Sequence, residues 1–323
     1  LPLLDEDHIL GFDEIEVSKD DAKCKLAEKW MQKTAVDSEL QVNENDTQIH
    51  IKGREFAYTI DRRTALFTEM KFAGREYLNH PMELNIWRAP TDNDMYIKAE
   101  WKKAHYDKAY TRAYTTEVVQ GKHGVKIVSH ASVVAETVQK ILDVTITWKI
   151  DASGKIDADI EATKDGEFPD LPRFGVRMFL DKKLSDARYF GMGPQESYRD
   201  KHQAASHGLY RANVGDLHED YIRPQENGSH YDCEYVELNN SRYGIVASAE
   251  KAFSFNASYY TQEELEKKTH NYELIESDSV VFCVDYALNG IGSNSCGPVV
   301  LEQYRFDDVL FRFQFTLMPY VKG

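Results

Sequence analysis

The chain has 323 residues, 42% of them hydrophobic and 12% aromatic, which is enough to bury a substantial core. Its formal net charge of −15 disfavours contact with nucleic-acid phosphate and anionic lipid, so we expect neither a nucleic-acid nor a membrane partner. The sequence contains no apolar run of about twenty residues that would span a membrane, and no secretory signal is visible.

The N-terminal part of the chain differs from the rest. Residues 20–32 have the composition of a helix, and polar residues cluster over 36–45, where a weak seam precedes a series of strands. The chain opens at Leu1 without an initiator methionine, inside sequence that already has structural patterning. We therefore expect a fragment or a processed piece of a longer protein.

Alternation of apolar and polar residues with a period of two predicts many strands with one wet face. The predicted strands cover residues 48–52, 56–60, 125–129, 142–150, 155–161, 174–180, 280–287 and 311–317. Turn residues punctuate the series at 151–154, 227–228 and 289–290.

Helical signals are few and short. Thr261 followed by Glu264 has the spacing of a capping box and predicts a helix over 261–268, whereas 98–109 is ambiguous. Many strands and few short helices predict a mainly β protein, specifically a large antiparallel β-sandwich.

The four cysteines, Cys24, Cys233, Cys283 and Cys296, form no CxxC pair and have no zinc-like spacing with histidine. Cys233 and Cys283 lie in apolar strand patterns, which predicts buried free thiols. This cysteine usage fits a cytoplasmic location.

The segment GIGSNSCGP (290–298) is rich in glycine and carries Ser293, Ser295 and Cys296. Its spacing matches no phosphate-binding loop, so a turn-rich loop that allows close backbone approach is the plain interpretation. A nucleophilic role for Cys296 would require a nearby histidine, which the sequence does not show.

Acidic residues offer candidates for glycoside hydrolysis, which uses two carboxyl groups roughly 5–10 Å apart. Asp92, Asp94, Glu196 and Glu226 are suitable by type. With 54 acidic residues in the chain, however, pairs of carboxyl groups at this separation are expected anyway, so they are almost no evidence for hydrolysis.

The loop RAPTDND (88–94) concentrates hydrogen-bonding groups in seven residues. Asp92, Asn93 and Asp94 could bind backbone amides and Arg88 could bridge a carboxylate bidentately, which would brace the loop. The alternative is a polar rim around a sugar. The segments 189–200 and 221–229 also place aromatics beside amides and acids, which suits sugar binding or ordinary loops at a sandwich edge.

Four motifs occur in order: WRAPTDND (87–94), YFGMGPQESYRDK (189–201), YIRPQENG (221–228) and GIGSNSCGP (290–298). Together they resemble the C-terminal domain (domain 5, small-chain type) of glycoside hydrolase family 2 β-galactosidases. The resemblance covers residues from about 40 to 323 and implies a galactose mutarotase-like supersandwich over 39–323. Residues 8–17 (HILGFDEIEV) resemble closing strands of the preceding immunoglobulin-like domain, to which 1–38 are assigned.

The resemblance implies a part of an enzyme that hydrolyses terminal β-D-galactosides such as lactose. In that family the catalytic glutamates and magnesium ligands belong to a TIM barrel, so we expect no catalytic residue, metal or cofactor in this chain. The expected partners are the catalytic domains and, in the assembled enzyme, the galactoside. The isolated chain should be inactive, and its exposed apolar face could promote self-association.

In this family, two loops of the domain help to close the mouth of the active site. They correspond to 95–100 and 290–298, which places Met95, Tyr96, Ser295 and Cys296 near substrate. Some members have a tryptophan platform where Cys296 stands and a glycine close after the DND motif where Met95 and Tyr96 stand. The structural motif residues are Trp87, Arg88, Asp92, Asn93, Asp94, Gly193, Pro194, Glu196, Glu226 and Asn227.

Two other functions are compatible with a strand-rich chain. A mutarotase-like aldose epimerase would need a general acid and a general base, for which the available histidines are His105, His123, His130 and His202. A freestanding carbohydrate-binding module would retain a galactoside without turnover.

Overall fold

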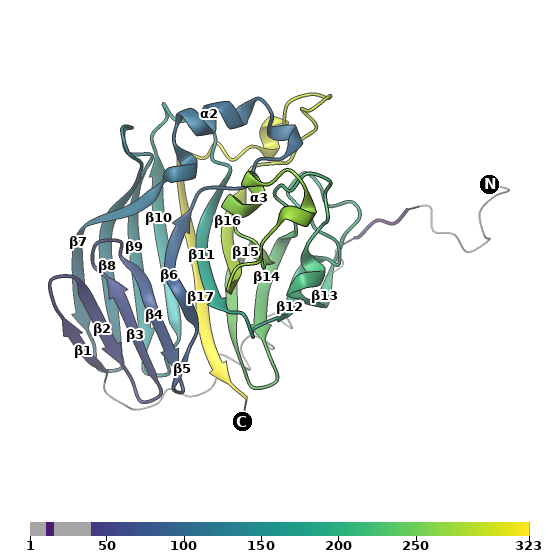
Figure 1. Cartoon of the computed structure of the whole chain (residues 1–323). Helices are drawn as coiled ribbons and strands as arrows, with labels where there is room; N and C mark the ends of the chain where they lie inside the picture. The colour runs from purple at the N-terminus through teal and green to yellow at the C-terminus, as the bar shows by residue number, and fades with distance from the viewer. Residues whose placement is uncertain (1–10, 16–39, 323) are drawn as a thin grey trace.

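The computed structural model describes residues 11–15 and 40–322, and strands dominate it (Figure 1). A five-stranded antiparallel sheet has the order β1-β2-β3-β4-β5. Its strands are β1 (Gln41–Glu44), β2 (Gln48–Lys52), β3 (Phe56–Asp61), β4 (Leu66–Phe72) and β5 (Arg75–Glu76). The mainly β, antiparallel fold predicted from the alternation is confirmed.

A second sheet contains twelve strands, with the continuous path β13-β12-β14-β15-β17-β10-β9-β8-β7 and a branch through β16, β11 and β6. Its strands are β6 (Leu78–Asn85), β7 (Tyr110–Gln120), β8 (Gly124–Val134), β9 (Leu142–Asp151), β10 (Ile156–Lys164), β11 (Arg173–Asp181), β12 (Asp186–Gly193), β13 (Ser206–Asn213), β14 (Ser229–Asn239), β15 (Tyr243–Ser258), β16 (Ser279–Leu288) and β17 (Leu310–Val321).

The branch arises at β15, the longest described strand. Its first part, from Tyr243 to Ser248, pairs with β17, and its last part, from Ser254 to Ser258, pairs with β16. β15 thereby contributes to both layers of the sandwich. In these layers, β1–β6 lie over β7–β10 (Figure 1).

The core lies between these layers. On β17 the side chains of Phe311, Phe313 and Phe315 are buried while those between them face solvent, as the alternation predicts. Trp148 on β9 packs edge-on against Phe67 on β4, and its indole N–H donates to the Ala65 carbonyl (2.8 Å). This hydrogen bond satisfies the polar end of a fully buried aromatic residue.

The helices are short: α2 (Ile97–Lys103), α3 (Gln262–Lys267) and the 3-10 helices η1 (Asp92–Asp94), η2 (Tyr106–Lys108), η3 (Val214–Leu217), η4 (Asn271–Glu273) and η5 (Glu302–Tyr304). At α3 the Thr261 hydroxyl accepts the Glu264 N–H (3.1 Å), so the Thr261 half of the predicted capping box is present. The Glu264 carboxylate accepts the Ile275 N–H (2.9 Å). The ambiguous segment 98–109 forms α2 and η2.

Several predictions fall on residues that the structure does not describe. They are the helix over 20–32, Cys24, residues 36–39 of the polar seam over 36–45, and the assignment of 1–38 to a preceding domain, of which only 11–15 are described. The rest of the seam is described and contains β1.

Candidate functional site

The four motif segments meet at one end of the sandwich, the end that carries α2 (top of Figure 1). The Glu226 N–H donates to the Ala89 carbonyl (3.0 Å), which joins the third motif to the first. The Gly228 N–H donates to Glu196 Oε2 (2.9 Å), which joins the third to the second. Segments more than a hundred residues apart in sequence therefore form one assembly, here called the motif end (residues 87–96, 193–201, 219–229 and 289–301).

Arg88 is the centre of the first motif. Its guanidinium is fully buried and forms the predicted bidentate pair with Asp94, with Nη2–Oδ1 at 2.7 Å and Nε–Oδ2 at 3.2 Å. The same guanidinium donates to the carbonyls of Asn289 (2.5 Å) and Gly290 (3.1 Å). Arg88 thus fixes the start of the fourth motif, and Asp94 compensates its charge.

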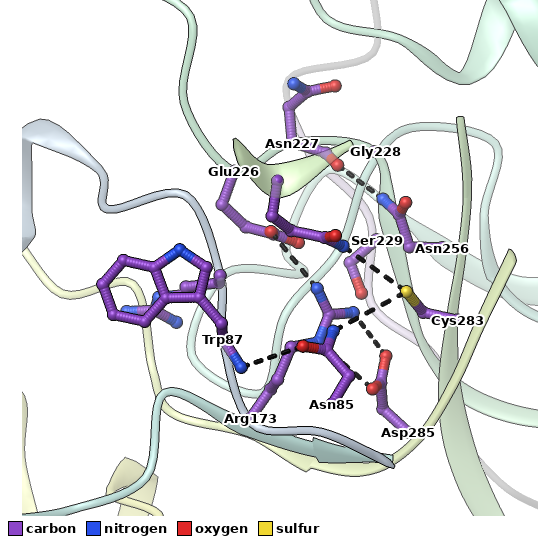
Figure 2. Close-up of polar contacts among 12 residues, drawn as sticks. Asn85, Trp87, Arg173, Glu226, Asn227, Gly228, Ser229, Asn256, Cys283 and Asp285 are labelled. Atoms are coloured by element: carbon purple, nitrogen blue, oxygen red, sulfur yellow. Dashed lines mark hydrogen bonds and ion pairs between the residues drawn. The ribbon is translucent and has the colours of Figure 1, made fainter. Parts of the chain in front are cut away.

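A second buried arginine lies beneath the motif end and was not predicted. Figure 2 shows Arg173 of β11 between Asp285 of β16 and Glu226. Arg173 Nη2 is 2.5 Å from Asp285 Oδ2, and Nη1 is 3.4 Å from Glu226 Oε2. The sequence signal was a charged residue inside an otherwise apolar strand, as in FCVDYAL, since such a charge must find a partner when it is buried.

Glu226 is the least compensated carboxyl group of this network. Its Oε1 atom is buried and makes no hydrogen bond, while Asp285 takes the bidentate position on Arg173. Burial raises the pKa of Glu226 to about 7, although the charges of Arg173 and Arg88 act in the opposite direction. The Asn227 side chain next to it accepts the Glu219 N–H (3.0 Å).

Glu196 joins the second motif to the third. Its carboxylate accepts from Lys201 Nζ (2.5 Å), from the Tyr221 hydroxyl and from the Gly228 N–H. Earlier in the same motif, at the end of β12, the Gly193–Pro194 peptide bond is cis. The candidate acids Asp94, Glu196 and Glu226 therefore each contact a basic side chain.

Asp92 and Trp87 occupy different environments. Asp92 is exposed, and its backbone N–H donates to Gln225 Oε1 (3.0 Å), whereas its carboxylate has only a long contact with Gln225 Nε2 (3.4 Å). Trp87 is buried edge-on against Trp101 of α2, with Lys102 Nζ 4.8 Å from its ring centroid.

Asn93 connects the two loops that the resemblance places near substrate. Its side-chain amide donates to the Gly292 carbonyl (2.7 Å), and its Oδ1 accepts from the Ser295 hydroxyl (2.7 Å). Met95 and Tyr96 follow directly and are exposed, as is Cys296 beside Ser295. One side chain thus links η1, directly before Met95, to the glycine-rich loop. Residues 97–100 of the first predicted loop instead form the start of α2.

Asp200 anchors the glycine-rich loop from the other side. Its carboxylate accepts the N–H groups of Ile291 (2.9 Å) and Gly292 (2.7 Å). A Cβ atom at Gly290 would lie 2.9 Å from Asp200 Oδ2, and Gly292 has a φ of +65°. The close backbone approach predicted from the glycines is present, and the approaching group is this carboxylate.

The histidines considered for acid–base chemistry lie on different parts of the fold. His130 is on β8 with Nδ1 3.1 Å from the Thr145 hydroxyl, and His202 Nδ1 is 3.0 Å from the Tyr198 carbonyl. His105 precedes η2, and His123 lies in the turn between β7 and β8.

Cys233 and Cys283 are buried free thiols, as predicted, and burial raises the pKa of Cys283 to about 11. Within the described residues, no three His, Cys, Asp or Glu side chains are arranged to hold a metal ion. Across residues 11–15 and 40–322, no helix is long and apolar enough to cross a membrane.

An antiparallel sandwich with a braced loop end defines the class of domain, and comparison with known proteins gives the family. Residues 52–317 match the family described as "Beta galactosidase small chain". A β-galactosidase of Actinobacillus pleuropneumoniae is 42% identical over 316 residues, covering 98% of this chain and 30% of that protein. A β-galactosidase of Staphylococcus xylosus is 32% identical over 282 residues, covering 87% and 28%. The chain belongs to the β-galactosidase small-chain family, which confirms the resemblance of the four motifs.

The chain therefore spans about 30% of the length of the curated relatives it matches. Among solved structures, a galactose 1-epimerase from Lactobacillus acidophilus NCFM aligns with 88% of this chain and 99% of its own, with a TM-score of 0.44 and 10% identity.

Proposed function

We propose that this chain is the part of a β-galactosidase that completes the mouth of the active site. In this proposal the catalytic glutamates and the magnesium ligands lie in another part of the enzyme, which hydrolyses terminal β-D-galactosides such as lactose. The observation that supports it most directly is the Asn93 bridge, which holds the tips at Met95–Tyr96 and Ser295–Cys296 together at one exposed end.

The surface of the motif end supports a covering partner. Tyr96 is 63% exposed, Ile222 89% and Leu301 60%, and all three lie on loops tied together by the contacts above. Exposed apolar side chains gathered on one end are typical of an interaction surface. We assign this surface to the remaining two-thirds of the enzyme, because the relatives are about three times as long as this chain.

The role of three polar residues of the first motif follows from their contacts. Arg88, Asn93 and Asp94 brace the two loops rather than act on the sugar, because their hydrogen-bonding groups face other protein groups. Cys296 contacts substrate through packing or backbone rather than through a stacking ring. We place the protein in the cytoplasm, where buried free thiols such as Cys233 and Cys283 are common.

The test is complementation. The 323-residue chain is mixed with the part of the Actinobacillus pleuropneumoniae relative that precedes the matching region, and hydrolysis of o-nitrophenyl β-galactoside is measured for the mixture and for each part. We expect turnover in the mixture only. Turnover by this chain alone, or a folded mixture no more active than its parts, would contradict the proposal.

A matched pair of variants makes the test specific. Tyr96→Ser should weaken complementation, because it removes a ring from the proposed contact surface. Tyr272→Ser, at an 84% exposed tyrosine on η4, should leave complementation unchanged. Equal effects of the two substitutions on complementation would show that the motif end is not part of the contact surface.

A further inference from the structure

A groove of about 580 Å³ runs along the solvent-facing side of the large sheet, over β10, β15 and β17. The loop residue Arg199 and the strand residues Tyr231 and Tyr286 contribute to its lining. Its volume lies in the range of ligand pockets, roughly 300–1,000 Å³. The exposed side chains that the proposed function uses, Tyr96, Ile222 and Leu301, do not line this groove.

The floor of the groove presents a fixed row of polar side chains. Arg312 forms a bidentate pair with Asp159, with Nε–Oδ1 at 2.7 Å and Nη2–Oδ2 at 2.5 Å. Gln314, two residues along β17, donates to the same carboxylate (3.1 Å). These contacts hold the planar groups in place while Arg312 and Gln314 remain exposed to a ligand. Little side-chain entropy would be lost on binding.

The walls add aromatic surface. Tyr231 is half-buried and stacks on the His202 ring, with centroids 5.7 Å apart. Tyr286 is half-buried and stacks on Phe311, with centroids 5.1 Å apart and planes 15° from parallel. Each ring is fixed by its neighbour, and a tyrosine offers both an apolar face and a hydroxyl to a ligand.

The charge of the lining selects the class of ligand. Its residues include four basic and five acidic side chains, so the groove is nearly neutral in a chain of net charge −15. Neither a polyanion nor a polycation would gain much from it. Rigid donors and acceptors beside aromatic faces suit a neutral molecule that carries both hydroxyl groups and C–H faces.

Binding rather than catalysis is indicated by the same contacts. The hydrogen bond from Arg312 lowers the pKa of Asp159, which keeps this carboxylate ionised and unsuited to donate a proton. Among the described residues that line the groove there is no histidine.

We propose that this groove binds a neutral oligosaccharide, with Asp159, Arg312 and Gln314 hydrogen-bonding its hydroxyl groups and Tyr231 and Tyr286 packing on its sugar faces. This binding is independent of the proposed function, because it requires neither complementation nor turnover.

The test is isothermal titration calorimetry of the 323-residue chain with β-1,4-galactotetraose and with tetragalacturonate, an anionic chain of the same length. We expect saturable binding of the neutral sugar and at least about tenfold weaker binding of the anionic one, a difference of about 1.4 kcal/mol. No saturable binding of galactotetraose, or equal affinity for both, would overturn the proposal.

Gln314→Trp should reduce the affinity for galactotetraose at least about tenfold, because a bulky ring at this exposed position fills the groove. Glu117→Trp, at an exposed position on β7 of the same sheet, is the control and should bind as the wild type does. Glu250→Trp, on the β15 side of the groove, replaces Gln314→Trp if that variant fails to fold. Unchanged affinity in a folded groove variant would refute the site. Loss of a dimer on Gln314→Trp, seen by sedimentation, would instead assign the groove to a second copy of the chain.

Discussion

The buried arginine of the motif end and the one beneath it are each matched by a carboxylate, in the same segment for Arg88 and on other segments for Arg173. Arg88 pairs with Asp94, and Arg173 pairs with Asp285 and Glu226. Such pairs contribute little net stability compared with apolar packing, but removing one partner leaves a buried charge uncompensated and costs about 3–5 kcal/mol. The motif residues therefore act as a brace whose parts depend on one another.

Asp94→Ala should lower the free energy of unfolding by about 3–5 kcal/mol, because it leaves Arg88 buried without its counter-charge. Asp92→Ala, two residues away, should change it by no more than about 0.5 kcal/mol, because its carboxylate is exposed and holds only one long contact. Urea unfolding of the two variants and the wild type measures both. Similar losses in both variants would place the brace in the loop backbone rather than in the Arg88–Asp94 pair.

Glu226 makes stability depend on pH. Its folded-state pKa, about 7, lies above its ordinary value of 4.5, so the native state favours the protonated form. This contribution is fully present below about pH 4.5 and is lost as the pH rises through about 7. Relative to the wild type, Glu226→Gln should therefore gain stability between about pH 5 and pH 8, on the order of 3 kcal/mol.

His230 acts in the opposite direction in the wild type, because burial lowers its pKa to about 4 and its contribution is lost as the pH falls from about 6.5 to 4. Both proteins contain His230, so the difference between Glu226→Gln and wild type isolates Glu226. Urea unfolding at several pH values supplies the measurement, and a pH-independent difference would show that Glu226 stays ionised in the fold.

At the scale of elements, alternation identified the regular strands and failed on irregular ones. The predicted strands 142–150 and 311–317 correspond to β9 and β17, where one face is buried along the whole strand. β15 was not predicted, and β14 was indicated only by the apolar pattern around Cys233. β14 changes register between His230 and Tyr235, and β15 is exposed in its middle where it passes from β17 to β16. Bulges and a change of layer interrupt the period of two on which the prediction depends.

The cap of α3 gives a prediction at the scale of one element. Thr261→Ala should lower the free energy of unfolding by about 1 kcal/mol, because it removes the acceptor of the Glu264 N–H. Thr261→Ser keeps a hydroxyl acceptor and should stay close to the wild type. Thermal or urea unfolding of both distinguishes the cap from a general effect of truncating the threonine side chain, which would lower both variants equally.

At the scale of the whole molecule, the fold places its braced loops at the same end as the exposed side chains of Tyr96, Ile222 and Leu301. Without a covering partner, we expect that end to drive self-association of the isolated chain. The double variant Tyr96→Ser, Ile222→Ser should shift the chain towards monomer in sedimentation velocity. The matched control is the double variant Tyr272→Ser, Ile275→Ser, at side chains that are 84% and 68% exposed. It should not shift the chain towards monomer. A wild-type chain that stays monomeric at high concentration would contradict this expectation.

The sequence by itself determined the strand-rich class, the buried thiols, the cap at Thr261 and the family, because these depend on residue type and on the spacing of near neighbours. The tertiary structure alone decided which charges compensate one another. Arg173 and Asp285 are 112 residues apart, and Asp159 and Arg312 are 153 apart, so no local pattern relates them. Arg88 was expected to meet a carboxylate, but its contacts with the Asn289 and Gly290 carbonyls exist only because the strands bring the two loops to the same end. The groove over β10, β15 and β17 has the same origin, since strand pairing sets its floor, and residues of β14 and β16 with the loop residues Arg199 and Asp308 complete it.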